Sequence, residues 1–263
     1  MSERNSFPIS SKSSYFLLLL VFFFLGGCAG SQARYTSNVV EFLYPGKDKE
    51  PAKEQAVEKT PLTPFSIPFK AGIAFVPDAS STVAGGPRRA LLLSEKQKAD
   101  LMERISTSMR KYPFIKAVEL IPSQYLTAKG GFVNLDQIRS MYGIDVIALL
   151  SYDQVQHTDE GALSIMYWTL VGAYVIEGEK NDTSTMVDAA VFHIPDRRML
   201  FRSAGTSHVS AKSTPVNLSE QLRKDSYSGF EKAVDGLVAN LQEQFELFKA
   251  NAGKPTQEDK GIK

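Results

Sequence analysis

The pattern of hydrophobic and polar residues divides the 263-residue chain into an apolar start, a polar stretch and a region of alternating strand and helix patterns. From residue 67 onward, short apolar runs bounded by proline or glycine are typical of buried strands. We therefore predict strands over residues 69–76, 114–121 and 144–152. The third run carries apolar residues on both faces, which predicts a central strand covered on both sides.

Helical periodicity fills the two intervals between these runs. Ser94 and Gln97 fit a capping box, in which each side chain bonds a free amide group at a helix start. Asn134 is predicted to cap a second, short helix, and Gly143 to end it in the left-handed conformation. The expected order is therefore strand, helix, strand, helix, strand.

Two further apolar runs, 163–176 and 186–194, are separated by the turn-forming residues 177–182. This spacing favours an antiparallel hairpin, and residues 199–209 extend it to a meander. A lipid-facing strand alternates apolar and polar residues, whereas residues 166–174 are apolar at both parities, which favours burial in the core. An exposed aromatic platform for a glycan or peptide and a membrane-inserting hairpin stay open as the alternatives.

A long amphipathic helix is predicted over residues 218–250, because large apolar residues recur along one side. The fold class is therefore α/β or α+β, with a mixed sheet, an antiparallel meander, flanking helices and this carboxy-terminal helix. We place the globular domain at residues 67–250 and a disordered tail at 251–263.

The segment 28–66 is predicted to be a flexible tether, since its second half is rich in charge and proline and poor in large apolar groups. An apolar cluster at residues 39–44 interrupts it. The sequence leaves open whether this cluster is a strand, a docking element or an exposed patch.

The amino-terminal end has the pattern of a secretory signal. Residues 15–25 are apolar, and the run is too short for a permanent membrane helix, which needs about 20 residues. Leu25, Gly26 and Gly27 stand immediately before Cys28, the single cysteine of the chain. This junction resembles the lipobox read by lipoprotein signal peptidase, and that resemblance implies a signal peptide over 1–27 and a diacylglyceryl group on the sulfur of Cys28.

Several acyl chains on one residue make a stable membrane anchor, whereas one chain does not. Similarity to enterobacterial sorting implies the outer membrane, facing the periplasm, because Ala29 rather than aspartate follows the cysteine. The inner membrane and the cell surface stay open. One cysteine also excludes an intrachain disulfide.

Charge gives no sign of a nucleic-acid partner. The chain has 30 Lys and Arg against 29 Asp and Glu, a formal charge of +1, and nucleic-acid proteins usually concentrate basic residues on one face. Two basic clusters remain, Gly85-Gly86-Pro87-Arg88-Arg89 and Arg197-Arg198. The first is similar to an anion-binding loop, but the helix starts too far downstream, so both are predicted to be solvated turns.

Candidate chemistry is sparse. The three histidines, His157, His193 and His208, lack the close spacing of a zinc site. We expect His157 in a polar loop and His193 as a half-buried strand residue. A serine hydrolase built from Ser151, His193 and Asp188 is disfavoured, because large residues flank the serine. We predict no catalytic, metal-binding or cofactor-binding residues.

Three stretches together resemble the rhombotarget lipoprotein family: residues 37–45, 167–174 and 187–192. The resemblance implies an envelope lipoprotein and carries no established activity. The glycine-rich, hydrophobic sorting tail expected of some members is missing here. Residues 94–152 show a weaker similarity to the amino-terminal domain of TolB and to curli-secretion-type lipoproteins.

Together these features predict a membrane-anchored lipoprotein that acts as a non-enzymatic binding or accessory subunit in envelope assembly or secretion. Its expected partners are the membrane, through Cys28, and other envelope proteins. An oligomeric pore-forming secretion lipoprotein and an envelope hydrolase are the alternatives.

Overall fold

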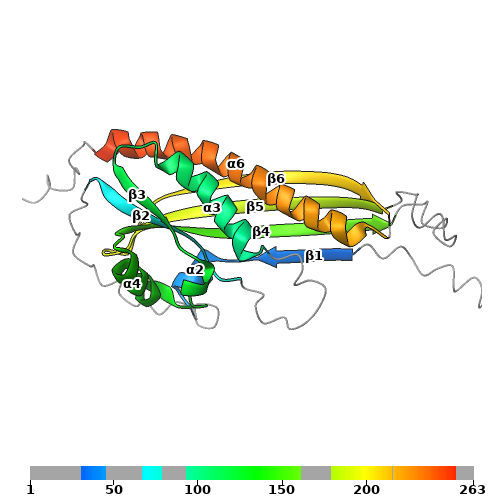
Figure 1. Cartoon of the computed structure of the whole chain (residues 1–263), viewed down its shortest axis with the longest axis horizontal. Helices are drawn as coiled ribbons and strands as arrows, with labels where there is room; N and C mark the ends of the chain where they lie inside the picture. Colours follow the sequence, from blue (N-terminus) through cyan, green and yellow to red (C-terminus); the bar gives the residue numbers. More distant parts are fainter. Residues whose placement is uncertain (1–30, 46–66, 79–92, 161–178, 215, 253–263) are drawn as a thin grey trace, which may run out of the picture.

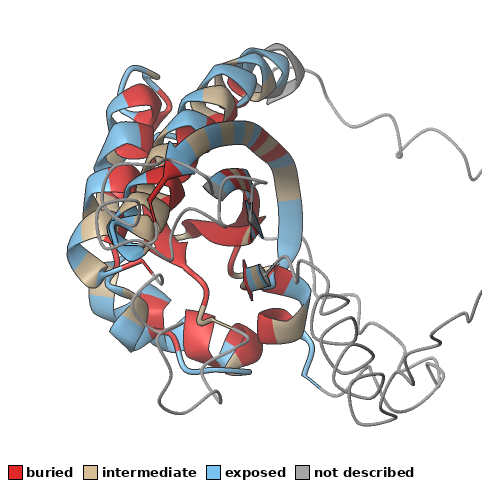
Figure 2. Cartoon of the chain, turned by 90° about the vertical axis from the view of Figure 1, so that its right-hand side faces the viewer, coloured by how far each residue is buried: buried red, intermediate tan, exposed pale blue. Residues whose placement is uncertain are grey.

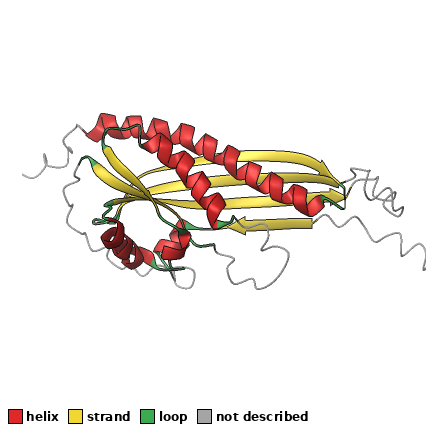
Figure 3. Cartoon of the chain, viewed as in Figure 1, coloured by secondary structure: helices red, strands yellow, loops and turns green. Residues whose placement is uncertain are grey.

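The computed structural model describes residues 31–45, 67–78, 93–160, 179–214 and 216–252. In this part of the chain, one mixed sheet carries helices on both faces (Figure 1, Figure 3), which confirms the predicted fold class. The strands are Ser31–Thr36 (β1), Phe69–Phe75 (β2), Ile115–Leu120 (β3), Val146–Glu160 (β4), Glu179–His193 (β5) and Arg198–Ser213 (β6). The helices are Val39–Leu43 (α2), Glu95–Met109 (α3), Gly131–Tyr142 (α4) and Leu218–Ala252 (α6), with a 3-10 turn at Ser123–Tyr125 (η2).

The strand order is β3-β2-β4-β5-β6, and β1 also pairs with β4. β2 runs parallel to both of its neighbours, whereas β4, β5 and β6 form an antiparallel meander. β2 lies beside residues 146–150 of β4, and β1 lies beside residues 153–158, so β1 and β2 stand end to end along one edge of β4. We call the part of the sheet beside β2 the proximal half and the part beside β1 the distal half.

Two predicted helix signals are confirmed. The Ser94 side chain accepts from the Gln97 amide at 3.3 Å, while the Ser94 amide donates to Gln97 Oε1 at 2.9 Å, which completes the capping box. α4 ends at Gly143 with φ of 63°, a conformation that glycine adopts without a Cβ clash.

The predicted capping role of Asn134 is wrong, because α4 already begins at Gly131. Asn134 lies buried within the helix, where its Oδ1 accepts from the Thr127 amide at 2.9 Å and its Nδ2 donates to the Tyr125 carbonyl at 3.2 Å. Its side chain therefore fastens the preceding turn onto the helix.

The proximal half is covered on both faces, as predicted for a central strand. Val146, Ala148 and Leu150 of β4 pack into a core with α3 and α6, while Ile147 and Leu149 pack into a second core with α2 and α4. Viewed from the distal end, the buried positions gather between the helices and the sheet (Figure 2). The parallel strands thus have the two-sided cover that an α/β sheet requires.

In the distal half the interior under α6 is polar. Gln154 is fully buried; its Nε2 donates to Thr185 Oγ1 at 2.7 Å and to the Ser226 carbonyl at 3.1 Å, and its Oε1 accepts from Ser226 Oγ at 2.6 Å. One turn earlier on α6, the Leu222 carbonyl accepts from Gln156 Nε2 at 2.9 Å. These bonds dock the first turns of α6 with polar groups, whereas Phe230, Leu241 and Phe245 dock its later turns with apolar ones.

The opposite face of the distal half, which we call the outer face, carries charged and hydroxyl side chains. Its residues include Arg34, Asp153, His157, Asp182, Ser184, Arg202 and His208. Arg34 pairs with Asp153, and Lys180 with Asp182 at 2.9 Å. Most of these groups are exposed or half-buried, so among the described residues the distal half has one face covered by α6 and one exposed face.

Two predictions about chain organisation need correction. Residues 31–45 belong to the fold, as β1 and α2, so the tether prediction is wrong for them; Phe42 and Leu43 are buried in the second core. The predicted turn at 177–182 is also wrong for residues 179–182, because β5 already starts at Glu179 and pairs with β4 along its whole length. Residues 163–176, the predicted hairpin partner of residues 186–194, fall outside the described ranges.

Candidate functional site

The connections between the parallel strands change from one face of the sheet to the other at one place. β2 leads through α3 to β3 on one face, and β3 leads through α4 to β4 on the other. Ligands of open α/β sheets bind beyond the carboxyl ends of the strands at such a switch point. Asp78 follows β2 and Ser123 follows β3, so both mark this edge, and the first turn of α3 reaches it with Glu95 and Lys98.

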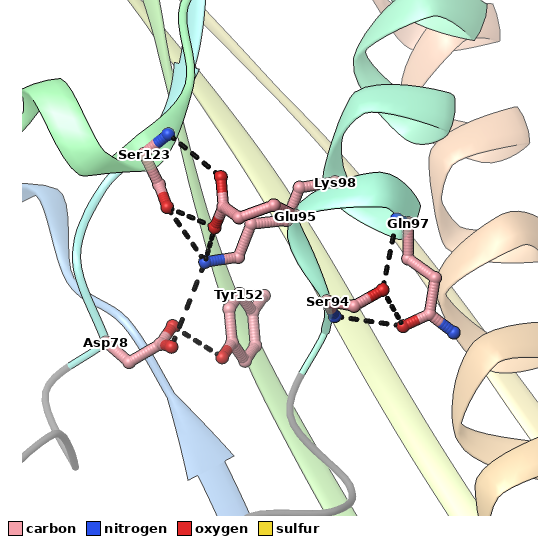
Figure 4. A network of polar contacts seen from close by, with 7 residues as sticks. All are labelled: Asp78, Ser94, Glu95, Gln97, Lys98, Ser123 and Tyr152. Carbon is pink, nitrogen blue, oxygen red and sulfur yellow. Dashed lines mark hydrogen bonds and ion pairs between the residues drawn. The ribbon is translucent and has the colours of Figure 1, made fainter.

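These residues form a polar network that we call the switch-point cluster: Asp78, Glu95, Lys98, Ser123 and Tyr152 (Figure 4). Lys98 stands at its centre and is only 5% exposed. Its Nζ lies 3.3 Å from Glu95 Oε1, 3.3 Å from Ser123 Oγ and 3.9 Å from Asp78 Oδ2. The ammonium group is thus held between two carboxylates and a hydroxyl.

Glu95 links α3 to the turn that follows β3. The Ser123 amide donates to Glu95 Oε2 at 3.2 Å, and the Ser123 hydroxyl donates a short hydrogen bond to Oε1. Burial works against ionisation of Glu95, but the bonds from Ser123 and the charge of Lys98 outweigh it and hold the pKa of the carboxyl below its ordinary value. Glu95 is therefore a carboxylate at neutral pH.

Tyr152 connects the cluster to the junction of β1 and β2. Its hydroxyl donates to Asp78 Oδ1 at 2.6 Å, and its amide donates to Ser37 Oγ at 3.1 Å. Burial, reinforced by the neighbouring carboxylate of Asp78, raises the pKa of the Tyr152 phenol far above its usual range. The phenol is therefore neutral at neutral pH.

The protonation states of Glu95 and Tyr152 limit the chemistry that the switch-point cluster can perform. Tyr152, a phenol with a raised pKa, is a poor base, and Glu95, a carboxyl with a lowered pKa, is a poor proton donor at neutral pH. With two carboxylates against one ammonium, the cluster also disfavours anions. It fastens β1, β2, α3, η2 and β4 to one another at the centre of the molecule.

The loop predicted to be similar to an anion site, Gly85 to Arg89, joins β2 to α3 and is not among the described residues. The second basic pair lies where β5 turns into β6, with Arg197 in the turn and Arg198 as the first residue of β6. Arg197 has φ of 54° and places its guanidinium 5.5 Å from the centre of the Phe132 ring. Arg198 lies 3.9 Å from Asp196, so both members of this pair have partners within the fold.

The histidines are dispersed. His193 is buried and its Nδ1 lies 2.8 Å from Asp196 Oδ1, which ties the end of β5 to the following turn. His157 is on β4 beside Asp159, so its predicted place in a loop is wrong. Across the described ranges no three His, Cys, Asp or Glu side chains are grouped to hold a metal ion.

The hydrolase set considered from sequence does not assemble. Ser151 and Asp188 are register partners on β4 and β5, but Asp188 binds Arg202 at 2.6 Å. His193 is five residues further along β5, about 17 Å away at strand spacing, and pairs with Asp196.

A different serine, histidine and aspartate lie together on the outer face, and the sequence analysis missed them. Ser184 Oγ is 3.2 Å from His208 Nδ1, and His208 Nε2 is 3.6 Å from Asp182 Oδ1. Only the register of β5 against β6 brings them together. Ser184 and Asp182 lie on β5, which pairs with β4 and β6, whereas His208 lies on β6, the last strand in the sheet order.

The residues of the lipobox, Leu25, Gly26, Gly27 and Cys28, precede the first described residue, Ser31. They are separated from β1 by only two residues, Ala29 and Gly30. No helix in the described part of the chain combines the length and apolarity needed to cross a bilayer.

Comparison with protein-family models finds no match for this chain, and comparison with curated proteins finds no match either.

Proposed function

We propose that this protein is a bacterial envelope lipoprotein, anchored by lipid on Cys28, whose domain binds envelope partners and has no catalysis of its own. The observation that carries the proposal is the sequence Leu25-Gly26-Gly27-Cys28 directly before a folded domain that starts at Ser31. The resemblance to rhombotarget lipoproteins supports the same assignment. Ala29 favours the outer membrane with the domain in the periplasm.

A binding rather than a catalytic role is supported by the chemistry of the polar groups. In the switch-point cluster each charged group is matched by another member, so the cluster stabilises the junction of five elements. The outer face, in contrast, presents paired charges and hydroxyl groups on a sheet surface that no helix in the described ranges covers. This face is the surface on which we place a protein partner.

The proposal is tested by Cys28→Ser, with Ser31→Ala as the matched control that leaves the lipobox unchanged. The first variant is expected to be recovered as a folded protein in the soluble fraction, and the control to stay with the membranes. Membrane retention of Cys28→Ser would contradict lipid anchoring. Crosslinking from the outer face of the wild-type protein is expected to recover defined envelope proteins, and recovery of bulk lipid alone would contradict the binding role.

A pore-forming oligomer is the second candidate, favoured by one observation. Glu160 and Glu179 pair at the end of the sheet that also holds Ser31, and the sequence that joins them has no charged residue from 162 to 176. Ring-shaped oligomers in detergent extracts are expected under this alternative, and a monomer or a small partner complex under the first.

A further inference from the structure

We infer that the distal end of the sheet faces the lipid bilayer and that the long axis of the sheet stands away from it, so that the partner of this end is a lipid surface. The inference rests on the proposed lipidation of Cys28. The distal end is defined here by Ser31, Thr158, Glu160, Glu179 and Ser213. The first turn of α6, from Leu218, follows Ser213 by five residues.

The short connection between Cys28 and Ser31 determines which end of the sheet lies near the membrane. Cys28 and Ser31 are three residues apart, and three extended residues span at most about 10 Å. Ser31 is opposite Thr158 in the register of β1 and β4, Glu160 is opposite Glu179, and Glu179 is opposite Ser213. One short chain therefore holds the ends of four strands close to the lipid headgroups.

Because the strands are long, the rest of the domain extends away from the membrane. β5 has 15 residues and β6 has 16, which correspond to about 50 Å at 3.4 Å per residue. The junction of β1 and β2, where Tyr152 and Asp78 meet, is about 20 Å further along than Ser31 by the same spacing. The proximal end, with Arg198 and His193, is the most distant from the anchor.

An arrangement with the outer face flat on the membrane is disfavoured by charge. Arg34, Lys180 and Arg202 each pair with an aspartate on that face, so anionic headgroups would compete with protein carboxylates for the same cations. These paired charges are also strongly hydrated, and their transfer into the headgroup layer carries a desolvation cost. An upright domain leaves them in water, where a protein partner can reach them.

A single-cysteine design tests the orientation, because the thioether consumes the one native thiol. Lys212→Cys, Thr206→Cys and Met199→Cys place a fluorophore at exposed positions near the distal end, the middle and the proximal end of β6. The lipidated proteins are reconstituted in phosphatidylethanolamine and phosphatidylglycerol vesicles, with a nitroxide quencher on a fraction of the headgroups. Unchanged circular dichroism of the labelled proteins shows that the labels leave the fold intact.

We expect quenching at position 212 to be at least about five times that at position 199, with position 206 close to the lower value, since contact quenching requires approach within the diameter of a few atoms. Equal quenching at all three positions, or the reverse order, overturns the inference while leaving lipidation intact. Mass spectrometry of the same samples separates the two claims: absence of lipid on Cys28 overturns the proposed function together with the orientation.

Insertion of 12 Gly and Ser residues between Gly30 and Ser31 tests the reach of the anchor. Such a linker has a root-mean-square length of about 19 Å, so quenching at position 212 is expected to fall at least twofold. Unchanged quenching at position 212 would overturn the claim that the short connection to Cys28 orients the domain.

Discussion

Gly205 of β6 and Gly236 of α6 lie against each other where the long helix crosses the strand. A Cβ on Gly205 would stand 2.0 Å from the Ala233 carbonyl oxygen and 2.3 Å from the Leu237 amide nitrogen, both backbone atoms that cannot turn aside. A Cβ on Gly236 would stand 3.6 Å from the Gly205 Cα, an ordinary van der Waals contact. The two glycines contact each other, but only Gly205 has to lack a Cβ for the helix and the strand to approach this closely.

Alanine substitution should therefore act in opposite directions at this crossing. Gly205→Ala is expected to destabilise the protein by at least about 2 kcal/mol, because overpacking forces helix and strand apart. Gly236→Ala is expected to be neutral or to stabilise by up to about 1 kcal/mol, since alanine favours the helix more than glycine does. Chemical unfolding of both variants checks this, and a similar loss of stability in both would contradict the geometry of the crossing.

The central ammonium of the switch-point cluster should be essential to stability. Lys98→Met leaves the carboxylates of Asp78 and Glu95 without their cation, and we expect a loss of about 3 kcal/mol in unfolding free energy. The matched control is Lys96→Met on the same helix, where the lysine side chain is 85% exposed and pairs with Asp100. That change should cost less than about 0.5 kcal/mol, and equal effects of the two substitutions would refute the buried role of Lys98.

Asp225 should make stability depend on pH. It is 4% exposed, Gln221 donates to its Oδ1 at 2.8 Å, and its Oδ2 has no hydrogen-bond partner. Burial raises the pKa of the Asp225 carboxyl against the bond from Gln221. The folded state therefore holds the proton more tightly than the unfolded state, so this stabilising contribution is complete below about pH 4, near the unfolded pKa, and is lost as pH rises through the folded pKa.

Asp225→Asn is accordingly expected to stabilise the protein at pH 7 by about 1 kcal/mol, which corresponds to about 2 to 4 °C in Tm, and to give no gain near pH 4. Glu220→Gln on the same helix serves as the control, because its carboxyl has a lowered pKa through Lys224 and should show no gain at pH 7. Thermal melts across this pH range check the sign. A gain that is larger at pH 4 than at pH 7 would be incompatible with a raised pKa.

The two halves of α6 should differ in local stability. Residues 222–229 dock on Gln154, Gln156 and Thr185, whereas Phe230, Leu241 and Phe245 dock on the apolar core. Apolar burial stabilises by about 25 cal/mol per Å², while a hydrogen bond contributes only about 1 kcal/mol net. Native-state hydrogen exchange is expected to show faster opening of amides before Gly229 than of amides between 230 and 245, and uniform protection along α6 would show that the polar layer docks as firmly as the apolar one.

The sequence was sufficient where local chemistry determines structure. The capping box of Ser94 and Gln97 and the left-handed Gly143 depend on neighbours within four residues, and both were predicted. The alternation of three strands and two helices up to β4 followed from apolar runs bounded by proline and glycine, which are typical of buried strands.

The distal half could not be predicted because its interior is polar. The inward positions of β4 are Gln154, Gln156 and Thr158, and half-buried Val155 points to the outer face. The usual alternation, with apolar residues inside and polar residues outside, is therefore inverted. β1 has little apolar character and becomes a strand only through pairing with β4. The switch-point cluster and the set of Ser184, His208 and Asp182 likewise depend on register and topology, which one sequence does not reveal.

Mass spectrometry of the mature amino-terminal peptide from fractionated membranes tests the central claim most directly. Lipid anchoring predicts a peptide that begins at Cys28, carries a diacylglyceryl modification on its sulfur and is found in outer-membrane fractions. An unmodified Cys28, or a peptide that still begins at Met1, would contradict the account of this protein as an envelope lipoprotein.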